Sequence, residues 1–171
     1  FRPLVVTDKK LAKLPIIQKI TDDLLSQNIS PQIWSNFEGN PCESHISNGV
    51  EQFNAHKADS IIAVGGGAAL DVSKAIGLAI NHHEELHKYE DGNPESLSID
   101  LHIPPIIAVP TAAGTGSEVG GSSVLSCAKT HRKFIIWSPK LIPLKVIADP
   151  NLTVSLPRST TATTGIDALC H

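Results

Sequence analysis

The chain has 171 residues, a hydrophobic content of 41% and a formal net charge of −3, which are ordinary values for a domain with a buried core. The slightly acidic balance gives no electrostatic reason to expect nucleic acid as a partner. No apolar run is long enough to span a membrane, and the first residues do not have the composition of a signal peptide. Three cysteines, an odd number without a CxxC pair, favour reduced thiols and a cytoplasmic location over a disulfide framework.

Strand and helix patterns alternate along the chain. Runs of apolar and β-branched residues predict strands at 3–7, 31–37, 60–64, 105–110, 133–137 and 145–148. Apolar residues at helical spacing predict helices at 16–25, 44–56 and 69–80, and a further helix is expected to begin near Pro157. The alternation predicts an α/β fold in which a parallel sheet carries helices on both faces. Ligands of such sheets bind at the carboxyl ends of the strands, so the loops that follow strands are the candidate sites.

The ends of the chain suggest a piece of a longer protein. The sequence contains no methionine, so Phe1 is not a translation start, and a strand pattern begins almost at once. We therefore expect further sequence beyond these residues.

The stretch AVGGGAALDVSKAIG runs from a strand through three glycines into a helix. Glycines let the backbone approach a phosphate closely, and a helix N-terminus supplies unpaired N–H groups and a positive dipole. Leu70 replaces the third glycine of the usual dinucleotide fingerprint, and no P-loop motif occurs. On this pattern alone, phosphate binding and a tight turn without a ligand both remain open.

Two other loops follow apolar strands. PTAAGTGSEVGG, residues 110–121, is dense in glycine and small hydroxyl residues that suit the lining of a cofactor groove, although a flexible loop has the same composition. Asp8 ends the first strand, where a carboxylate can accept hydrogen bonds from ribose hydroxyls. Its neighbours Lys9 and Lys10 are equally compatible with a plain exposed turn.

Asp167 and His171 stand four residues apart in GIDALCH, so a helix would place both side chains on one face. A carboxylate oxygen and an imidazole nitrogen could then supply half of the ligands of a divalent metal. The alternative is a charged residue near a helix start with a histidine that is merely close to it.

HEELH, residues 83–87, matches the HExxH motif of zinc metalloproteases letter for letter. It follows a predicted helix directly, lies in strongly polar sequence and has no evident third ligand. We interpret it as the solvated end of a surface helix.

In their order and spacing, VVTDK, NP at 40–41, GGGAALDVSK, PTAAGTGSE, RKF and GIDALCH resemble the iron-containing (group III) alcohol dehydrogenases. The resemblance covers essentially the whole chain. It implies a Rossmann-like, dehydroquinate synthase-like α/β domain for dinucleotide binding at 1–152. It also implies that 153–171 begins a helical metal-binding domain, the rest of which is missing from this chain.

The resemblance also implies roles for single residues. Asp8 matches the acid that binds the adenosine ribose, and Asn40 matches an asparagine beside the cofactor. The residues that match the pyrophosphate loop and the acid close behind it are Gly66, Gly67, Ala68 and Asp71. The other matching cofactor contacts are Thr111, Ala112, Gly120 and Lys133. Asp167 and His171 match the first two metal ligands, and two histidines of the helical domain complete that metal site in the family.

Two positions depart from the family pattern. GGGA stands in place of GGGS and PTA in place of PTT, so Ala68 and Ala112 each lack a hydroxyl that would contact the cofactor. The backbone N–H of Ala68 could still bind a phosphate.

The resemblance implies a cytoplasmic, homodimeric oxidoreductase that transfers a hydride between an alcohol or aldehyde and NAD, with Fe(II) or Zn(II) as the metal. The alternatives are a glycerol dehydrogenase- or dehydroquinate synthase-like enzyme, which PTAAGTGSE disfavours, and a non-catalytic nucleotide-binding module. Because two metal ligands would lie outside the chain, we expect the 171 residues alone to be inactive.

Overall fold

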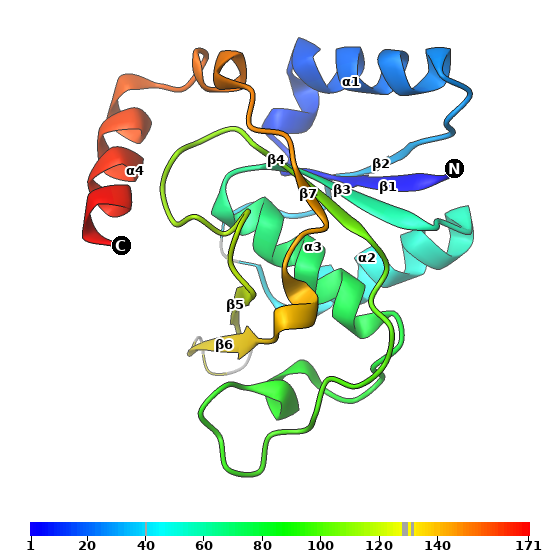
Figure 1. The fold of residues 1–171 in the computed structure, drawn as a ribbon, viewed down its shortest axis with the longest axis vertical. Helices are drawn as coiled ribbons and strands as arrows, with labels where there is room; N and C mark the ends of the chain where they lie inside the picture. The colour runs from blue at the N-terminus through cyan, green and yellow to red at the C-terminus, as the bar shows by residue number, and fades with distance from the viewer. Residues whose placement is uncertain (40, 128–129, 131) are drawn as a thin grey trace.

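A five-stranded parallel sheet forms the centre of the computed structural model, which describes residues 1–39, 41–127, 130 and 132–171 (Figure 1). The strands lie in the order β2-β1-β3-β4-β7. Their bounds are β1 Pro3–Val6, β2 Gln32–Trp34, β3 Ser60–Gly65, β4 Ile106–Pro110 and β7 Lys145–Val146. Val5 pairs with Ile62 of β3, and Ile62 pairs with Ile107 of β4, so the carboxyl ends of the three central strands meet at one edge.

Helices cover both faces of this sheet (Figure 1). Helix α1 (Pro15–Ser26) lies on one face, while α2 (Glu43–His56) and α3 (Gly67–Ala79) lie on the other. Successive side chains of a strand point to opposite faces, so each face has a core of its own. Val5 and Ile62 pack with α1, whereas Leu4 and Ile61 pack in the core of α2 and α3. The predicted parallel sheet with helices on both faces is therefore confirmed.

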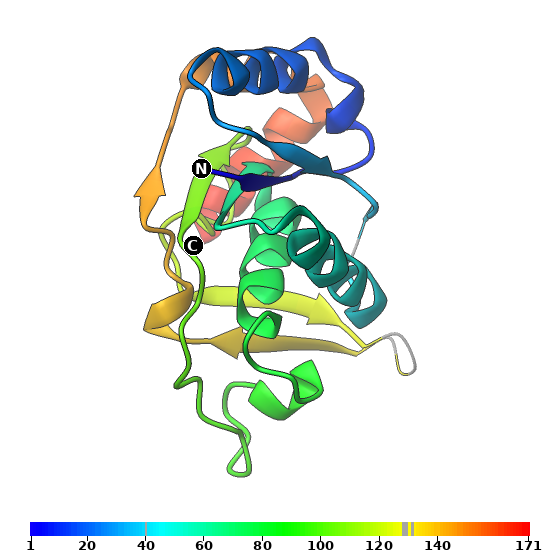
Figure 2. The ribbon, with the colours of Figure 1, turned by 90° about the vertical axis from the view of Figure 1, so that its right-hand side faces the viewer.

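An antiparallel hairpin of β5 (Ser122–Ser126) and β6 (Lys133–Trp137) packs on α3, away from the sheet (Figure 2). The predicted strand at 133–137 is therefore confirmed, although it pairs with β5 in a separate two-stranded sheet and only one of its faces is buried. Only Phe134 and Ile136 of β6 are buried, because one face of the hairpin packs on α3 and the other faces outward. The partner β5 was not predicted, because its sequence is rich in serine.

Helix α3 ends before HEELH, so the predicted surface helix end at 83–87 is wrong. After Ala79 the ring of His82 terminates the helix: its Nδ1 lies 3.0 Å from the Leu78 carbonyl oxygen, while its Nε2 accepts a hydrogen bond from the N–H of Leu101. The next helical segment is a short 3₁₀ helix, Leu86–Tyr89, which includes only the last two residues of HEELH. His83 and His87 are exposed, as expected of a solvated segment.

The last part of the chain crosses back to the carboxyl edge of the sheet. Two short 3₁₀ helices, Pro139–Leu141 and Pro150–Thr153, flank β7, and α4 (Arg158–Cys170) then stands beside the loop that follows β4 (Figure 1). No helix in the described part of the chain has both the length and the apolar character that crossing a membrane requires.

Candidate dinucleotide and metal site

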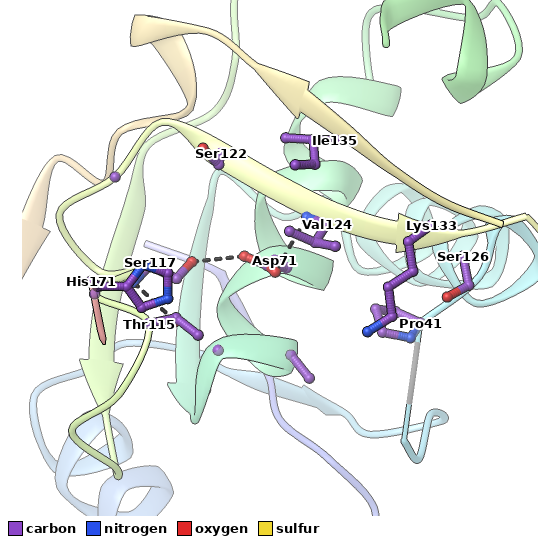
Figure 3. Close-up of a pocket in the computed structure, with 14 residues that line it drawn as sticks. Pro41, Asp71, Thr115, Ser117, Ser122, Val124, Ser126, Lys133, Ile135 and His171 are labelled. Atoms are coloured by element: carbon purple, nitrogen blue, oxygen red, sulfur yellow. Dashed lines mark hydrogen bonds between the residues drawn. The ribbon is translucent and has the colours of Figure 1, made fainter. Parts of the chain in front are cut away.

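Two adjoining cavities open where β1, β3 and β4 end. The Asp8 cavity, of about 640 Å³, lies between these strand ends and α4. The Asp71 cavity, of about 580 Å³, lies between the start of α3, the loop after β4 and the β5–β6 hairpin (Figure 3). Gly67 and Thr115 line both cavities.

All eleven described residues with a predicted role line one or both of these cavities. The Asp8 cavity contains Asp8, Gly66, Gly67, Thr111, Ala112 and Asp167. The Asp71 cavity contains Gly67, Ala68, Asp71, Gly120, Lys133 and His171. Asn40, the twelfth residue, lies outside the described residues. The structure thus brings together residues from five separate stretches of sequence.

Asp8 is held in place by the turn that follows β1. Its Oδ1 accepts hydrogen bonds from the backbone N–H groups of Lys10 (2.8 Å) and Leu11 (2.9 Å). Within the described residues Oδ2 accepts no such bond, so one carboxylate oxygen can serve a ligand. The ammonium of Lys10 does not neutralise this carboxylate directly, because it lies 2.8 Å from the carboxylate of Glu38.

The glycine turn between β3 and α3 needs its glycines for two different reasons. Gly65 has a φ of +149°, and a Cβ there would lie 2.7 Å from that of Ala69. A Cβ on Gly67 would lie 2.9 Å from Oγ1 of Thr115, so the loop after β4 closely approaches the start of α3. Residues 66–68 line the cavities, where the unpaired N–H groups of a first helical turn can bind an anion. This arrangement fits a pyrophosphate group.

A buried polar network that the sequence did not predict lies behind the Asp71 cavity. Lys74 is fully buried, and its Nζ donates to Oγ of Ser117 at 2.9 Å. The same hydroxyl donates to Oδ1 of Asp71 at 2.7 Å (Figure 3). Burial raises the pKa of Asp71, and burial lowers the pKa of Lys74 to about 8 although the charge of Asp71 opposes that shift. A pKa of about 8 keeps the ammonium the majority form at pH 7. The sequence signal was two opposite charges in a helix that otherwise consists mostly of apolar and small residues.

Asp167 lies in the last turn of α4 and His171 caps the end of that helix, so both side chains lie on one side, as their spacing predicts. His171 Nε2 is 3.8 Å from Asp167 Oδ1. Asp167 lines the Asp8 cavity and His171 lines the Asp71 cavity, at the end opposite Lys133 in Figure 3. The two donor types suit iron(II) or zinc(II). Among the described residues, no group of three or more His, Cys, Asp or Glu side chains could hold a metal ion.

Comparison with known proteins gives a consistent result. The family model for iron-containing alcohol dehydrogenases matches residues 1–150. The 1,3-propanediol dehydrogenase of Citrobacter freundii is 38% identical over 99% of this chain and 43% of its own length.

Two solved structures extend this likeness to the fold. The crystal structure of a 1,3-propanediol oxidoreductase matches with a TM-score of 0.90 and 38% identity, over 98% of this chain and 43% of that chain. The sulfoacetaldehyde reductase of Bifidobacterium kashiwanohense, solved in complex with NAD+, matches with a TM-score of 0.87 and 32% identity, over 97% of this chain and 43% of that chain. The chain spans less than half the length of these relatives. Because the family model matches most of its residues, the chain belongs to the iron-containing alcohol dehydrogenase family.

Proposed function

We propose that the protein, at its full natural length, is an NAD- and iron-dependent dehydrogenase that interconverts a small alcohol and its aldehyde. The observation that carries this proposal is the gathering of eleven residues with expected cofactor or metal roles around two adjoining cavities. The names of the relatives, which include a propanediol dehydrogenase and a reductase solved with NAD+, support the same class of reaction.

The dinucleotide would lie along the carboxyl edge of the sheet. Asp8 would accept hydrogen bonds from the adenosine ribose, and the N–H groups at the start of α3 would bind the pyrophosphate. Ala68 contributes no hydroxyl, but its backbone N–H remains suited to a phosphate. Gly120 and Lys133, in the Asp71 cavity, would contact the remainder of the molecule. When bound, NAD supplies the hydride acceptor for the carbinol carbon.

Asp167 and His171 would hold the metal, with iron(II) preferred because of the family and zinc(II) equally compatible with the two donors. When bound, a divalent ion supplies a Lewis acid that lowers the pKa of the alcohol hydroxyl. Because the two residues line different cavities, the alcohol would bind where the Asp8 and Asp71 cavities adjoin. We place the boundary between the dinucleotide-binding and metal-binding domains near residue 152, just before α4.

We also propose a cytoplasmic homodimer. The thiols of Cys42 and Cys170, which form no disulfide, suit a reducing compartment. The dimer is inferred from the family resemblance. Size-exclusion chromatography with light scattering would measure the mass, and a monomer at micromolar concentration would contradict the dimer.

The enzyme proposal is tested with the protein expressed at its full natural length and loaded anaerobically with Fe(II). We expect NAD-dependent oxidation of short primary alcohols and diols, followed by the absorbance of NADH. Asp167→Ala is expected to abolish turnover while NAD titration still quenches tryptophan fluorescence. Bound NAD and bound iron without turnover on any small alcohol would contradict the enzyme and favour a non-catalytic nucleotide-binding module.

A further inference from the structure

The fully buried ammonium of Lys74 contacts four oxygen atoms of the segment 117–122. Its Nζ lies 2.6 Å from the carbonyl oxygen of Ser117, 2.9 Å from the hydroxyl of Ser117, and 2.8 Å from the carbonyl oxygens of both Gly120 and Ser122. Three carbonyls within six residues therefore converge on one cation. Ser117 and Gly120 lie in the loop and Ser122 is the first residue of β5, so Lys74 supplies the donor that backbone pairing would supply within a helix or a sheet.

We propose that Lys74 is a positioning residue for dinucleotide binding: through these four contacts it fixes the loop that forms the shared wall of the two cavities. This inference rests on the proposed function, because it assigns to Lys74 an effect on a cofactor that Lys74 does not itself touch. Lys74 lines neither cavity.

Asp71 supplies the second attachment of the same loop. Its Oδ1 accepts a hydrogen bond from the Ser117 hydroxyl, and its Oδ2 accepts one from the backbone N–H of Val124 at 3.2 Å. The Ser117 hydroxyl thus accepts from Lys74 and donates to Asp71, so the two opposite charges act on one loop residue. Each oxygen of Asp71 thus accepts one hydrogen bond from the protein and retains a lone pair, so Asp71 can hold the loop and still face the cavity in which its cofactor role is expected.

The loop that is held in this way reaches the cofactor site through Thr115. Thr115 lies two residues before Ser117, and Thr115 Oγ1 accepts a hydrogen bond from the Ser117 N–H at 3.3 Å. The same Oγ1 atom would lie only 2.9 Å from a Cβ on Gly67, closer than van der Waals contact allows, so Thr115 covers the start of α3. Without the ammonium, the inward carbonyls would be left unpaired in a buried place, which is unfavourable unless the loop turns them toward water. That movement would carry Thr115 away from Gly67 and open the shared wall.

The test uses the protein at its full natural length and compares Lys74→Met, Asp71→Asn, the double variant and Lys19→Met, an exposed lysine on α1, as a matched control. Three quantities are measured: the Kd of NAD from tryptophan fluorescence, the Tm without NAD, and the rate of cleavage after Glu118 by a glutamate-specific protease. Glu118 lies inside the loop, so its cleavage reports loop order independently of NAD.

We expect Lys74→Met to raise the Kd of NAD by at least about tenfold, because NAD binding must then also order the loop, and to accelerate cleavage after Glu118. The double variant removes both charges, so it should regain much of the Tm but neither the affinity nor the protection of Glu118. Lys19→Met should change none of the three. If the double variant regains the affinity as well, or if Lys74→Met leaves Kd and cleavage unchanged, Lys74 only balances the charge of Asp71 and the proposal is wrong.

Two results would call for a further comparison: a Lys74→Met variant that does not fold, and a wild type that does not bind NAD. If Lys74→Met does not fold, Ser117→Ala removes the shared hydroxyl without changing any charge. It should raise both the Kd and the cleavage rate, and an unchanged pair of values would overturn the proposal. If the wild type binds no NAD, the proposed function fails, while cleavage after Glu118 still decides whether Lys74 holds the loop.

Discussion

At the scale of single residues, the environment of Asp8 determines which dinucleotide the site should accept. A ribose with free 2′ and 3′ hydroxyls can donate to the carboxylate, and a hydrogen bond to a charged group contributes about 1.5–3 kcal/mol. A 2′-phosphate would instead bring roughly two negative charges beside a third. Lys10, the nearest cation that lines the same cavity, is paired with Glu38 and is not available to the phosphate without breaking that ion pair.

We therefore predict a preference for NAD over NADP of at least about tenfold in kcat/KM, or near 1.4 kcal/mol. Asp8→Gly should narrow or reverse it. Asp8→Asn is the sharper variant, because an amide oxygen can still cap the N–H groups of Lys10 and Leu11 while the charge is lost. Glu38→Gln should also favour NADP by freeing Lys10. Equal use of both cofactors by the wild type, or no shift in Asp8→Asn, would remove Asp8 from the cofactor site.

The histidines of HEELH give a second prediction at this scale. His87 lies 3.7 Å from Glu43 and 3.5 Å from Glu85, but no group of three or more His, Cys, Asp or Glu side chains in the described residues is arranged to hold a metal ion. The double change His83→Ala and His87→Ala should leave the metal content and activity of the full-length protein unchanged. Metal content would be measured by plasma emission spectroscopy, and loss of a stoichiometric zinc would revive the metalloprotease interpretation.

At the scale of secondary-structure elements, the start of α3 and the loop after β4 must approach each other closely. Gly67→Ala would place a Cβ 2.9 Å from Thr115 Oγ1, so either the hydroxyl rotates and loses its bond to the Ser117 N–H or the loop moves. We predict weaker NAD binding, measured by fluorescence titration. Gly66→Ala should weaken it less, because its Cβ would meet only the Cβ of Ala112, at 4.0 Å.

A compensating change separates this contact from a general effect on the helix. Thr115→Ala removes the hydroxyl that the new methyl group would meet, so the double variant with Gly67→Ala should regain part of the affinity. Additive losses in the double variant would show that the close approach of Thr115 does not explain the requirement for glycine.

The same elements show which parts of the fold the sequence could predict. Strands β1, β3 and β4 are continuous apolar runs because both faces of their sheet are covered, so their pattern is plain. Strand β5 could not be predicted because its serines do not form an apolar strand pattern. Ser123 is buried there with its hydroxyl donating to the carbonyl of Asp71, a partner 52 residues away. The role of Lys74 could not be predicted either, because its four oxygen partners lie 43 to 48 residues further along the chain. Motif spacing located the lining of the cavities, but contacts between distant residues required coordinates.

At the scale of the whole molecule, the described residues include two of the metal ligands that we propose, Asp167 and His171. Two ligands leave an ion largely hydrated and weakly held. The 171 residues expressed alone, with Fe(II) or Zn(II), NAD and short primary alcohols, should therefore show no turnover. Isothermal titration should find weak metal binding at most. Robust activity of this piece would mean that its metal site is completed by residues other than those the family resemblance implies.

Helix α3 lies between the sheet and the β5–β6 hairpin, so nearly every side chain from Ala69 to Leu78 is buried. Because none of the positions from Ala69 to Leu78 is fully exposed, most substitutions there disturb packing, whether or not they touch a cofactor. A mutant library aimed at changing the cofactor or substrate of this protein would lose most of its α3 variants to misfolding. A library confined to the exposed loop residue Thr115, which lines both cavities, would leave this buried helix intact.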